Sequence, residues 1–168
     1  QHNKNLFNHI SDLEQQSKKV LEKYFSEEYF FEGNILYNTL KYFKNDDNLF
    51  IGNSLPVRTL EKFCPNSDTK ITVYSNRGAS GIDGVTSTAL GISALNSNLR
   101  SLLLIGDLSL YHDMNGLLAS QYKTNLTIVV INNHGGGIFS FLTIANANID
   151  TFEKYWTTDT GLDFEKVS

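Results

Sequence analysis

Short apolar runs recur along the chain from residue 48 onward, at residues 49–51, 71–74, 102–105 and 127–131. These runs do not alternate with polar residues, which is typical of strands buried on both faces of a sheet. A stretch compatible with a helix follows each run, so the pattern predicts successive βα units. We therefore expect an α/β fold with three layers, in which helices cover both faces of a mostly parallel sheet.

The first 47 residues have a different pattern, with apolar residues at helical spacing. One set comprises Leu6, Ile10, Leu13, Val20, Leu21 and Tyr24, and a second comprises Ile35, Leu36, Leu40 and Phe43. They predict two helices with a break near Ser26, which with the acidic residues after it resembles a helix N-cap. We assign residues 1–30 to a linker helix region and residues 31–168 to one domain.

Composition narrows the class of protein. The chain has 168 residues, of which 40% are hydrophobic and 19% charged, as expected for one globular domain. The formal net charge of −4 argues against nucleic-acid binding. A single cysteine, Cys64, cannot build a disulfide framework. Neither a membrane span nor a signal peptide is expected, so the predicted location is the cytoplasm. The first residue is not Met, which predicts a piece of a longer chain.

Glycine and small polar residues follow all four apolar runs. They occupy residues 52–58, 75–84, 106–109 and 132–137. Ligands bind at the carboxyl ends of parallel strands, so these loops predict one site at a solvent-facing edge of the sheet. Asp107 and Asn133 are oxygen donors suited to a hard divalent cation, and glycine-rich turns suit a diphosphate. The alternatives are that Asp107 is a helix N-cap, that Asn133 makes an Asx-turn, and that Arg58 and Arg77 form surface ion pairs.

His112 and His134 are weak candidates for acid–base catalysis. We expect His112 in the first turn of a helix, and neither histidine is paired with Ser and Asp as a triad.

The motifs resemble those of thiamine-diphosphate enzymes. Gly106-Asp107, followed by Asn132-Asn133, is similar to their metal–diphosphate motif, with Leu108 in place of a second glycine. Together with residues 52–58, 76–84, 112–117, 132–140 and 160–164, it resembles the 2-succinyl-5-enolpyruvyl-6-hydroxy-3-cyclohexene-1-carboxylate synthases of menaquinone biosynthesis. The resemblance spans roughly residues 32–168. His134 stands where that family usually has Asn or Asp, and Leu142-Thr-Ile replaces an expected Leu-Pro.

This resemblance implies cofactors, substrates and roles for individual residues. The cofactors are thiamine diphosphate and Mg or Mn, and the substrates are 2-oxoglutarate, which is decarboxylated, and isochorismate, which receives the succinyl unit. Asp107, Asn133 and the carbonyl of Gly135 would hold the metal. The cofactor-binding residues would be Ser54, Leu55, Ile82, Gly106, Asp107, Leu108, Ser109, Asn133, Gly135, Gly136 and Ile138. The substrate-facing residues would be Asn53, Arg58, Arg77, Phe139 and Leu142.

The resemblance also implies that residues 31–168 are a thiamine diphosphate-binding (diphosphate) domain truncated at its C-terminal end, and that other parts of the enzyme lie outside this chain. A Glu on a separate domain, contributed across the interface of a homodimer or tetramer, would activate the cofactor. We assign no catalytic residue here and expect the isolated chain to be inactive. Two alternatives stay open. One is another thiamine-diphosphate enzyme, such as an acetolactate synthase or a 2-oxo acid decarboxylase. The other is a phosphate-binding module without catalysis, although no nucleotide-binding glycine motif follows a strand.

Overall fold

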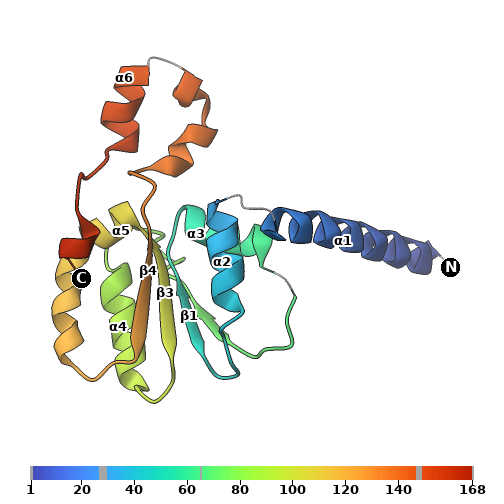
Figure 1. The fold of residues 1–168 in the computed structure, drawn as a ribbon, viewed down its shortest axis with the longest axis horizontal. Helices are drawn as coiled ribbons and strands as arrows, with labels where there is room; N and C mark the ends of the chain where they lie inside the picture. Colours follow the sequence, from blue (N-terminus) through green and yellow to red (C-terminus); the bar gives the residue numbers. More distant parts are fainter. Residues whose placement is uncertain (1, 27–29, 65, 147–148, 168) are drawn as a thin grey trace. The chain divides into compact units, whose positions relative to one another are not determined.

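The computed structural model describes residues 2–26, 30–64, 66–146 and 149–167 (Figure 1). The chain forms two compact units. Unit 1 comprises residues 1–43 and 59–68, and unit 2 comprises residues 44–58 and 69–168. The predicted boundary at residue 30 concerns the roles of the two parts in a longer protein and stays a prediction.

Unit 1 contains α1 (His2–Ser26), α2 (Glu32–Leu40) and the second part of α3 (Leu55–Phe63). Aromatic rings hold these helices together. Phe25 stacks on Tyr37 with centroids 4.0 Å apart, and Phe31 meets Phe63 edge to face at 5.5 Å. Gly33 packs against the rings of Phe31 and Phe63, where there is no space for a Cβ. Two helices in this region are therefore confirmed.

The predicted N-cap at Ser26 is wrong. Ser26 is the last residue of α1, and its hydroxyl donates to the carbonyl of Lys23 at 2.8 Å. The second helix begins later, at Glu32, with Phe31 as its cap residue. The acidic residues 27 and 28 of that predicted cap lie outside the described residues.

Unit 2 contains a sheet of four parallel strands. They are β1 (Asn48–Ile51), β2 (Thr72–Tyr74), β3 (Ser101–Gly106) and β4 (Leu126–Ile131), in the order β2-β1-β3-β4. All three strand pairs are parallel. Four apolar runs therefore form four strands as predicted, and the α/β class with a parallel sheet flanked by helices is confirmed.

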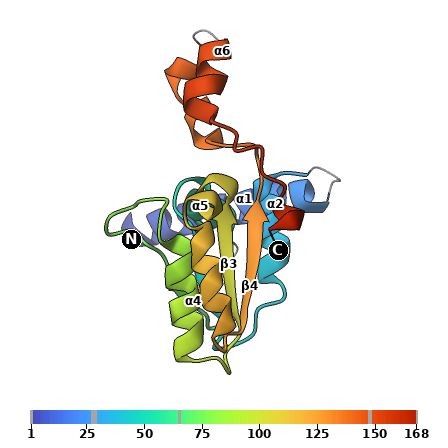
Figure 2. The ribbon, with the colours of Figure 1, turned by 90° about the vertical axis from the view of Figure 1, so that its left-hand side faces the viewer.

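Residue alternation divides the core between the two faces of the sheet. Phe50, Leu103 and Ile105 are on one face and pack with Val85 and Ala89 of α4 (Val85–Leu95). Figure 2 shows α4 alongside the sheet beside β3. On the other face Leu49, Ile51 and Leu104 are also buried. Coverage on both faces explains why the runs of β1 and β3 carry no polar alternation. For β2 the expectation of burial on both faces is wrong, because this edge strand leaves Thr72 and Val73 exposed.

The remaining elements are short and follow the carboxyl ends of β3 and β4. They are α5 (Asp107–His112), η1 (Met114–Gln121), η2 (Gly137–Phe141), η3 (Thr143–Asn146), α6 (Ile149–Phe152), the π-helical turn η4 (Glu153–Thr157) and η5 (Phe164–Lys166). Within the described ranges, no helix has the length and hydropathy needed to cross a membrane.

Candidate functional site

The strand order places a crevice at the carboxyl ends of β1 and β3. From β1 the chain runs to β2 on one side, and from β3 it runs to β4 on the other side. Loops that diverge in this way leave the position where ligands bind in open α/β sheets. A cavity of about 120 Å³ lies there, lined by Asn53, Ser54, Leu55, Pro56, Ile82, Gly106, Asp107, Leu108, Ser109, Asn133, Gly135, Gly136, Gly137, Ile138 and Phe139. All four strand-end loops contribute, as the sequence predicted.

Asp107 is the most buried polar residue of the cavity, with 1% of its surface exposed. Its Oδ2 accepts a hydrogen bond from the backbone N–H of Gly135 at 2.7 Å. Burial raises the pKa of Asp107, the backbone N–H groups of Leu108 and Gly135 oppose that rise, and the charge of Asp159 adds to it. The carboxylate is therefore held by oriented N–H groups in a place that penalises its charge.

Two sequence expectations about Asp107 need correction. The N-cap residue of α5 is Gly106, and Asp107 is the first helical residue, so the N-cap alternative is wrong. The expectation of a solvent-facing site is also wrong for Asp107, because its side chain is covered.

Asn133 lines the same cavity as Asp107 but is exposed. Its side chain lies against Gly137, where a Cβ would be 2.7 Å from the Asn133 Nδ2. The Asx-turn in this loop belongs to the preceding residue, because Asn132 Oδ1 accepts from the His134 N–H at 3.2 Å. The cavity is therefore lined by one carboxylate, that of Asp107, and by the carboxamides of Asn53 and Asn133. Within the described part of the chain, no group of three His, Cys, Asp or Glu side chains could hold a metal.

The glycine turn, Gly135 and Gly136, is buried between the cavity and a later segment of the chain. Gly135 has a φ of +121°, and a Cβ there would lie 2.0 Å from the carbonyl oxygen of Thr157. That same oxygen accepts from the Gly136 N–H at 2.7 Å. Only glycine fits this position, because a side chain would have to overlap the backbone at Thr157.

Asn53 connects two loops and presents an unsatisfied atom. Its Nδ2 donates to the carbonyls of Asn76 at 3.1 Å and Gly81 at 2.6 Å. Its Oδ1 is buried and has no hydrogen-bond partner among the described residues. A buried acceptor without a donor is costly, so a donor from a bound molecule would stabilise this arrangement.

The two serines of the site differ. Ser54 has a φ of +71°, an unusual conformation for a residue with a side chain. The Ser109 hydroxyl donates to the carbonyl of Ile82 at 2.6 Å, which connects the loops after β2 and β3. The hydroxyl proton of Ser109 is therefore used in a hydrogen bond within the protein.

Three predicted site residues do not line this cavity. Arg58, Arg77 and Leu142 are exposed. A guanidinium N–H of Arg58 donates to the carbonyl of Ser54 at 2.7 Å, one helical turn away. His112 is the last residue of α5, so the prediction that it lies in a first helical turn is wrong.

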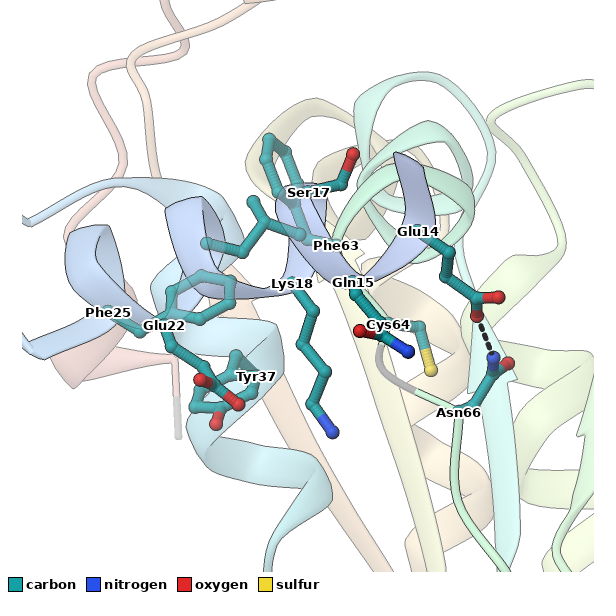
Figure 3. Close-up of a pocket in the computed structure, with 11 residues that line it drawn as sticks. Glu14, Gln15, Ser17, Lys18, Glu22, Phe25, Tyr37, Phe63, Cys64 and Asn66 are labelled. Carbon is teal, nitrogen blue, oxygen red and sulfur yellow. Dashed lines mark hydrogen bonds between the residues drawn. The ribbon is translucent and has the colours of Figure 1, made fainter. Parts of the chain in front are cut away.

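A second cavity, of about 410 Å³, lies within unit 1 (Figure 3). It is lined by apolar side chains such as Leu21, Phe25 and Phe63, and Asn66 donates to Glu14 at its edge at 2.7 Å. Cys64 also lines it, and burial raises the pKa of its thiol, which favours the unreactive protonated form. No predicted site residue lies there.

The fold and the first cavity define an α/β domain with a candidate ligand site at the switch point of a parallel sheet. No protein-family model matches the chain. Curated relatives do match, and all three of the following are named 2-succinyl-5-enolpyruvyl-6-hydroxy-3-cyclohexene-1-carboxylate synthase. The protein of Listeria monocytogenes serotype 4b (strain F2365) is 52% identical over 134 residues, which is 79% of this chain and 23% of that protein. The protein of Bacillus cytotoxicus is 43% identical over 160 residues, which is 95% of this chain and 26% of that protein. The protein of Staphylococcus epidermidis is 44% identical over 157 residues, which is 91% of this chain and 27% of that protein.

The chain is therefore a homologue of these synthases over most of its own length, and the predicted resemblance is confirmed. It spans about a quarter of the length of the curated relatives it matches.

Proposed function

We propose that this chain is the diphosphate-binding part of a thiamine diphosphate-dependent transferase. The complete enzyme would decarboxylate 2-oxoglutarate and add the succinyl unit to isochorismate, giving 2-succinyl-5-enolpyruvyl-6-hydroxy-3-cyclohexene-1-carboxylate and CO2 for menaquinone biosynthesis. The names of the curated relatives support this reaction. The observation that carries the proposal is the buried carboxylate of Asp107, which lines one cavity together with Asn133 and a glycine turn.

The donor set suits a divalent cation bound to a diphosphate. Asp107, Asn133 and the carbonyl of Gly135 would supply three oxygen ligands to Mg or Mn. Burial of Asp107 raises its pKa, and a cation beside it would oppose this effect by favouring the charged form. Space for the ligand also exists, because a Cβ added to Gly106 would meet no atom within 4 Å.

The diphosphate would be held mainly by backbone N–H groups. The proposed cofactor contacts are Ser54, Leu55, Gly106, Leu108, Ser109, Gly136 and Ile138, all of which line the cavity. Ile82 lines it too and would support the cofactor as an apolar prop. Thiamine diphosphate, when bound, supplies the decarboxylation and carbon–carbon bond chemistry. The residues of this chain bind it, orient it and exclude water around it.

Substrate recognition is proposed for five side chains, two of which line the cavity. Arg58 and Arg77 have the planar fork of donors that grips carboxylates, and both substrates are carboxylates. Asn53 and Phe139 line the cavity, and Asn53 offers its unpaired Oδ1. Leu142 would contribute an apolar surface. The activating Glu would come from another domain in a cytoplasmic homodimer or tetramer, so the isolated chain would not turn over substrate.

A steady-state comparison tests this function against the nearest alternative, an acetolactate synthase or another 2-oxo acid decarboxylase. The full-length protein that contains this chain is assayed for CO2 release from 2-oxoglutarate and from pyruvate, with and without isochorismate and with and without Mg2+. We expect 2-oxoglutarate to be consumed only when isochorismate and Mg2+ are both present. Preference for pyruvate would support the alternative enzyme, and turnover of neither would favour a phosphate-binding module.

A further inference from the structure

A short segment near the C-terminal end of the chain lies against the glycine turn. We call residues 156–159 the strap. The Gly136 N–H donates to the carbonyl of Thr157 at 2.7 Å, while the Gly135 N–H donates to Asp107 at 2.7 Å. Successive amides of the turn are thus bound by two different parts of the chain, one by the cavity carboxylate and one by the strap. The turn cannot move without breaking one of these two hydrogen bonds.

A side-chain pair joins the same two segments. His134 Nδ1 lies 3.3 Å from Asp159 Oδ2, and Asp159 Oδ1 accepts from the Gly161 N–H at 3.0 Å. Both carboxylate oxygens of Asp159 therefore have partners, which fixes the orientation of the group. His134 itself has a φ of +63°, a conformation that non-glycine residues seldom adopt. The pair therefore restrains an unfavourable backbone conformation at His134, the residue between Asn133 and the glycine turn.

The exposure of the His134–Asp159 pair limits how much it can contribute to the stability of the fold. The side chains of His134 and Asp159 are 73% and 48% exposed, and pairs this exposed contribute little to global stability. The pair can still affect ligand binding through the conformation of the turn, because small displacements at a ligand site change affinity even when they hardly change the folding free energy. Apolar contact supports the same arrangement, since the ring of Trp156 in the strap meets Phe139, a cavity residue, edge to face at 5.4 Å.

We propose that the strap is a positioning element for the cation–diphosphate site, and that Asp159 is its positioning residue. Asp159 holds the strap against the glycine turn through His134, so that the turn presents the Gly135 carbonyl and the neighbouring Asn133 to the cation. This inference rests on the proposed function, because it assumes that the cavity binds a divalent cation with a diphosphate. It assigns Asp159 no contact with the reacting atoms.

The chain offers a matched control for Asp159. Asp163 has the same local pattern: its Oδ1 accepts from the N–H two residues on, in Glu165, at 3.2 Å, and its Oδ2 pairs with Lys166 at 2.8 Å. Its side chain is 50% exposed, against 48% for Asp159. The two carboxylates differ in two respects: only Asp159 is joined to the loop that carries the glycine turn, and the charge of Asp159 also acts on Asp107. Asp159→Asn separates these two effects, because it removes the charge and keeps an acceptor.

The experiment compares Asp159→Ala and Asp163→Ala in the full-length protein. Calorimetric titration of Mg2+ in the presence of thiamine diphosphate gives the affinity, and hydrogen exchange of the peptide covering residues 132–140 gives the order of the turn. For Asp159→Ala we expect about 2- to 10-fold weaker Mg2+ binding, the equivalent of one lost hydrogen bond, and faster exchange of that peptide. Asp163→Ala should change neither. Asp159→Asn retains an acceptor and should stay within about 2-fold of the unmodified protein.

The possible failures are distinguishable. If the unmodified protein binds no Mg2+ with thiamine diphosphate, the proposed function is wrong, and this inference is overturned with it. If the unmodified protein binds and Asp159→Ala matches it in both affinity and exchange, the cavity function survives and the strap has no positioning role. Equal losses in Asp159→Ala and Asp163→Ala would also overturn the inference, because they would indicate a general effect of removing surface acids.

Discussion

Replacing Asp107 by Asn separates its role in cation binding from its role in the fold. Alanine is the less informative change, because it would leave the buried Gly135 N–H without an acceptor, at a cost of about 1–3 kcal/mol. Asn keeps the size of the side chain and one acceptor oxygen but removes the charge. In the absence of a cation, the weaker hydrogen bond and the loss of a buried charge oppose each other, so we expect stability to change by no more than about 1 kcal/mol.

The pH dependence follows from the raised pKa of Asp107. An acid whose pKa is higher in the folded than in the unfolded state stabilises the fold when protonated. That stabilisation is complete below its ordinary pKa of 3.8 and is lost as the pH rises through the higher folded value. The cation-free protein should therefore lose stability over this range as the pH rises, and Asp107→Asn should not show this loss.

The effect on cation binding should be much larger. Changing a residue that merely supports a metal ligand typically costs about 10- to 100-fold in affinity, so removing an anionic ligand should cost at least about 100-fold. At a ligand concentration 100 times the Kd, binding stabilises a protein by about 2.7 kcal/mol, and a 100-fold weaker site gives only about 0.4 kcal/mol. Thermal unfolding of the full-length protein, with and without Mg2+ and thiamine diphosphate, should thus show a ligand-dependent shift that nearly disappears in Asp107→Asn.

Asp113 provides the control for this experiment. It accepts hydrogen bonds from the backbone N–H and the hydroxyl of Ser87, at 2.6 and 2.8 Å, but does not line the cavity. Asp113→Asn should lower stability and leave the ligand-dependent shift intact. A full shift in Asp107→Asn would refute the assignment of Asp107 as a metal ligand.

Three further changes test other parts of the account. Replacing Arg58 or Arg77 by Ala should lower kcat/KM of the full-length enzyme about 10- to 100-fold and leave cofactor affinity nearly unchanged. Replacement by Lys should lower kcat/KM to a similar extent, because Lys lacks the fork of donors. Lower thermal stability with normal kinetics would indicate surface ion pairs instead. Gly135→Ala should destabilise the fold by at least about 1–3 kcal/mol in chemical denaturation, because φ is +121° and a Cβ would lie 2.0 Å from a backbone oxygen. Burial opposes ionisation of Asp47, but hydrogen bonds from Arg100 and from a backbone N–H outweigh this effect and lower the pKa of Asp47. The resulting stabilisation of the fold is present above pH 3.8 and is lost as the pH falls through the lower folded pKa. Asp47→Asn should abolish this loss of stability in acid, measured by unfolding at a series of pH values.

The sheet and the position of the cavity were predictable from the sequence. Continuous apolar runs indicate strands covered on both faces. Successive right-handed βα units bring the carboxyl ends of their parallel strands to the same edge of the sheet. Asp107 and Asn133 end up lining one cavity because they follow neighbouring strands, β3 and β4. This consequence of topology depends on no detail of side-chain packing.

Other features of the site depend on tertiary packing, which the pattern of residues does not contain. The burial of Asp107 results from the glycine turn folding over it. Asp159 lies 25 positions after His134 in an exposed segment with no periodicity, so no local signal marks it as a partner. The exposure of Arg58 and Arg77 could not be predicted either, because a loop motif identifies the edge of the sheet but not the direction of a long side chain.

Cofactor titration is the most direct test of the central claim that the cavity binds a diphosphate through a divalent cation. Thiamine diphosphate and a nicotinamide dinucleotide are each titrated calorimetrically into the full-length protein that contains this chain, with Mg2+ and then with a chelator in its place. We predict that thiamine diphosphate binds with one site per chain when Mg2+ is present, that chelation abolishes this binding, and that the dinucleotide does not bind under either condition. Binding of thiamine diphosphate that is unaffected by chelation, or binding of the dinucleotide in its place, would contradict the account.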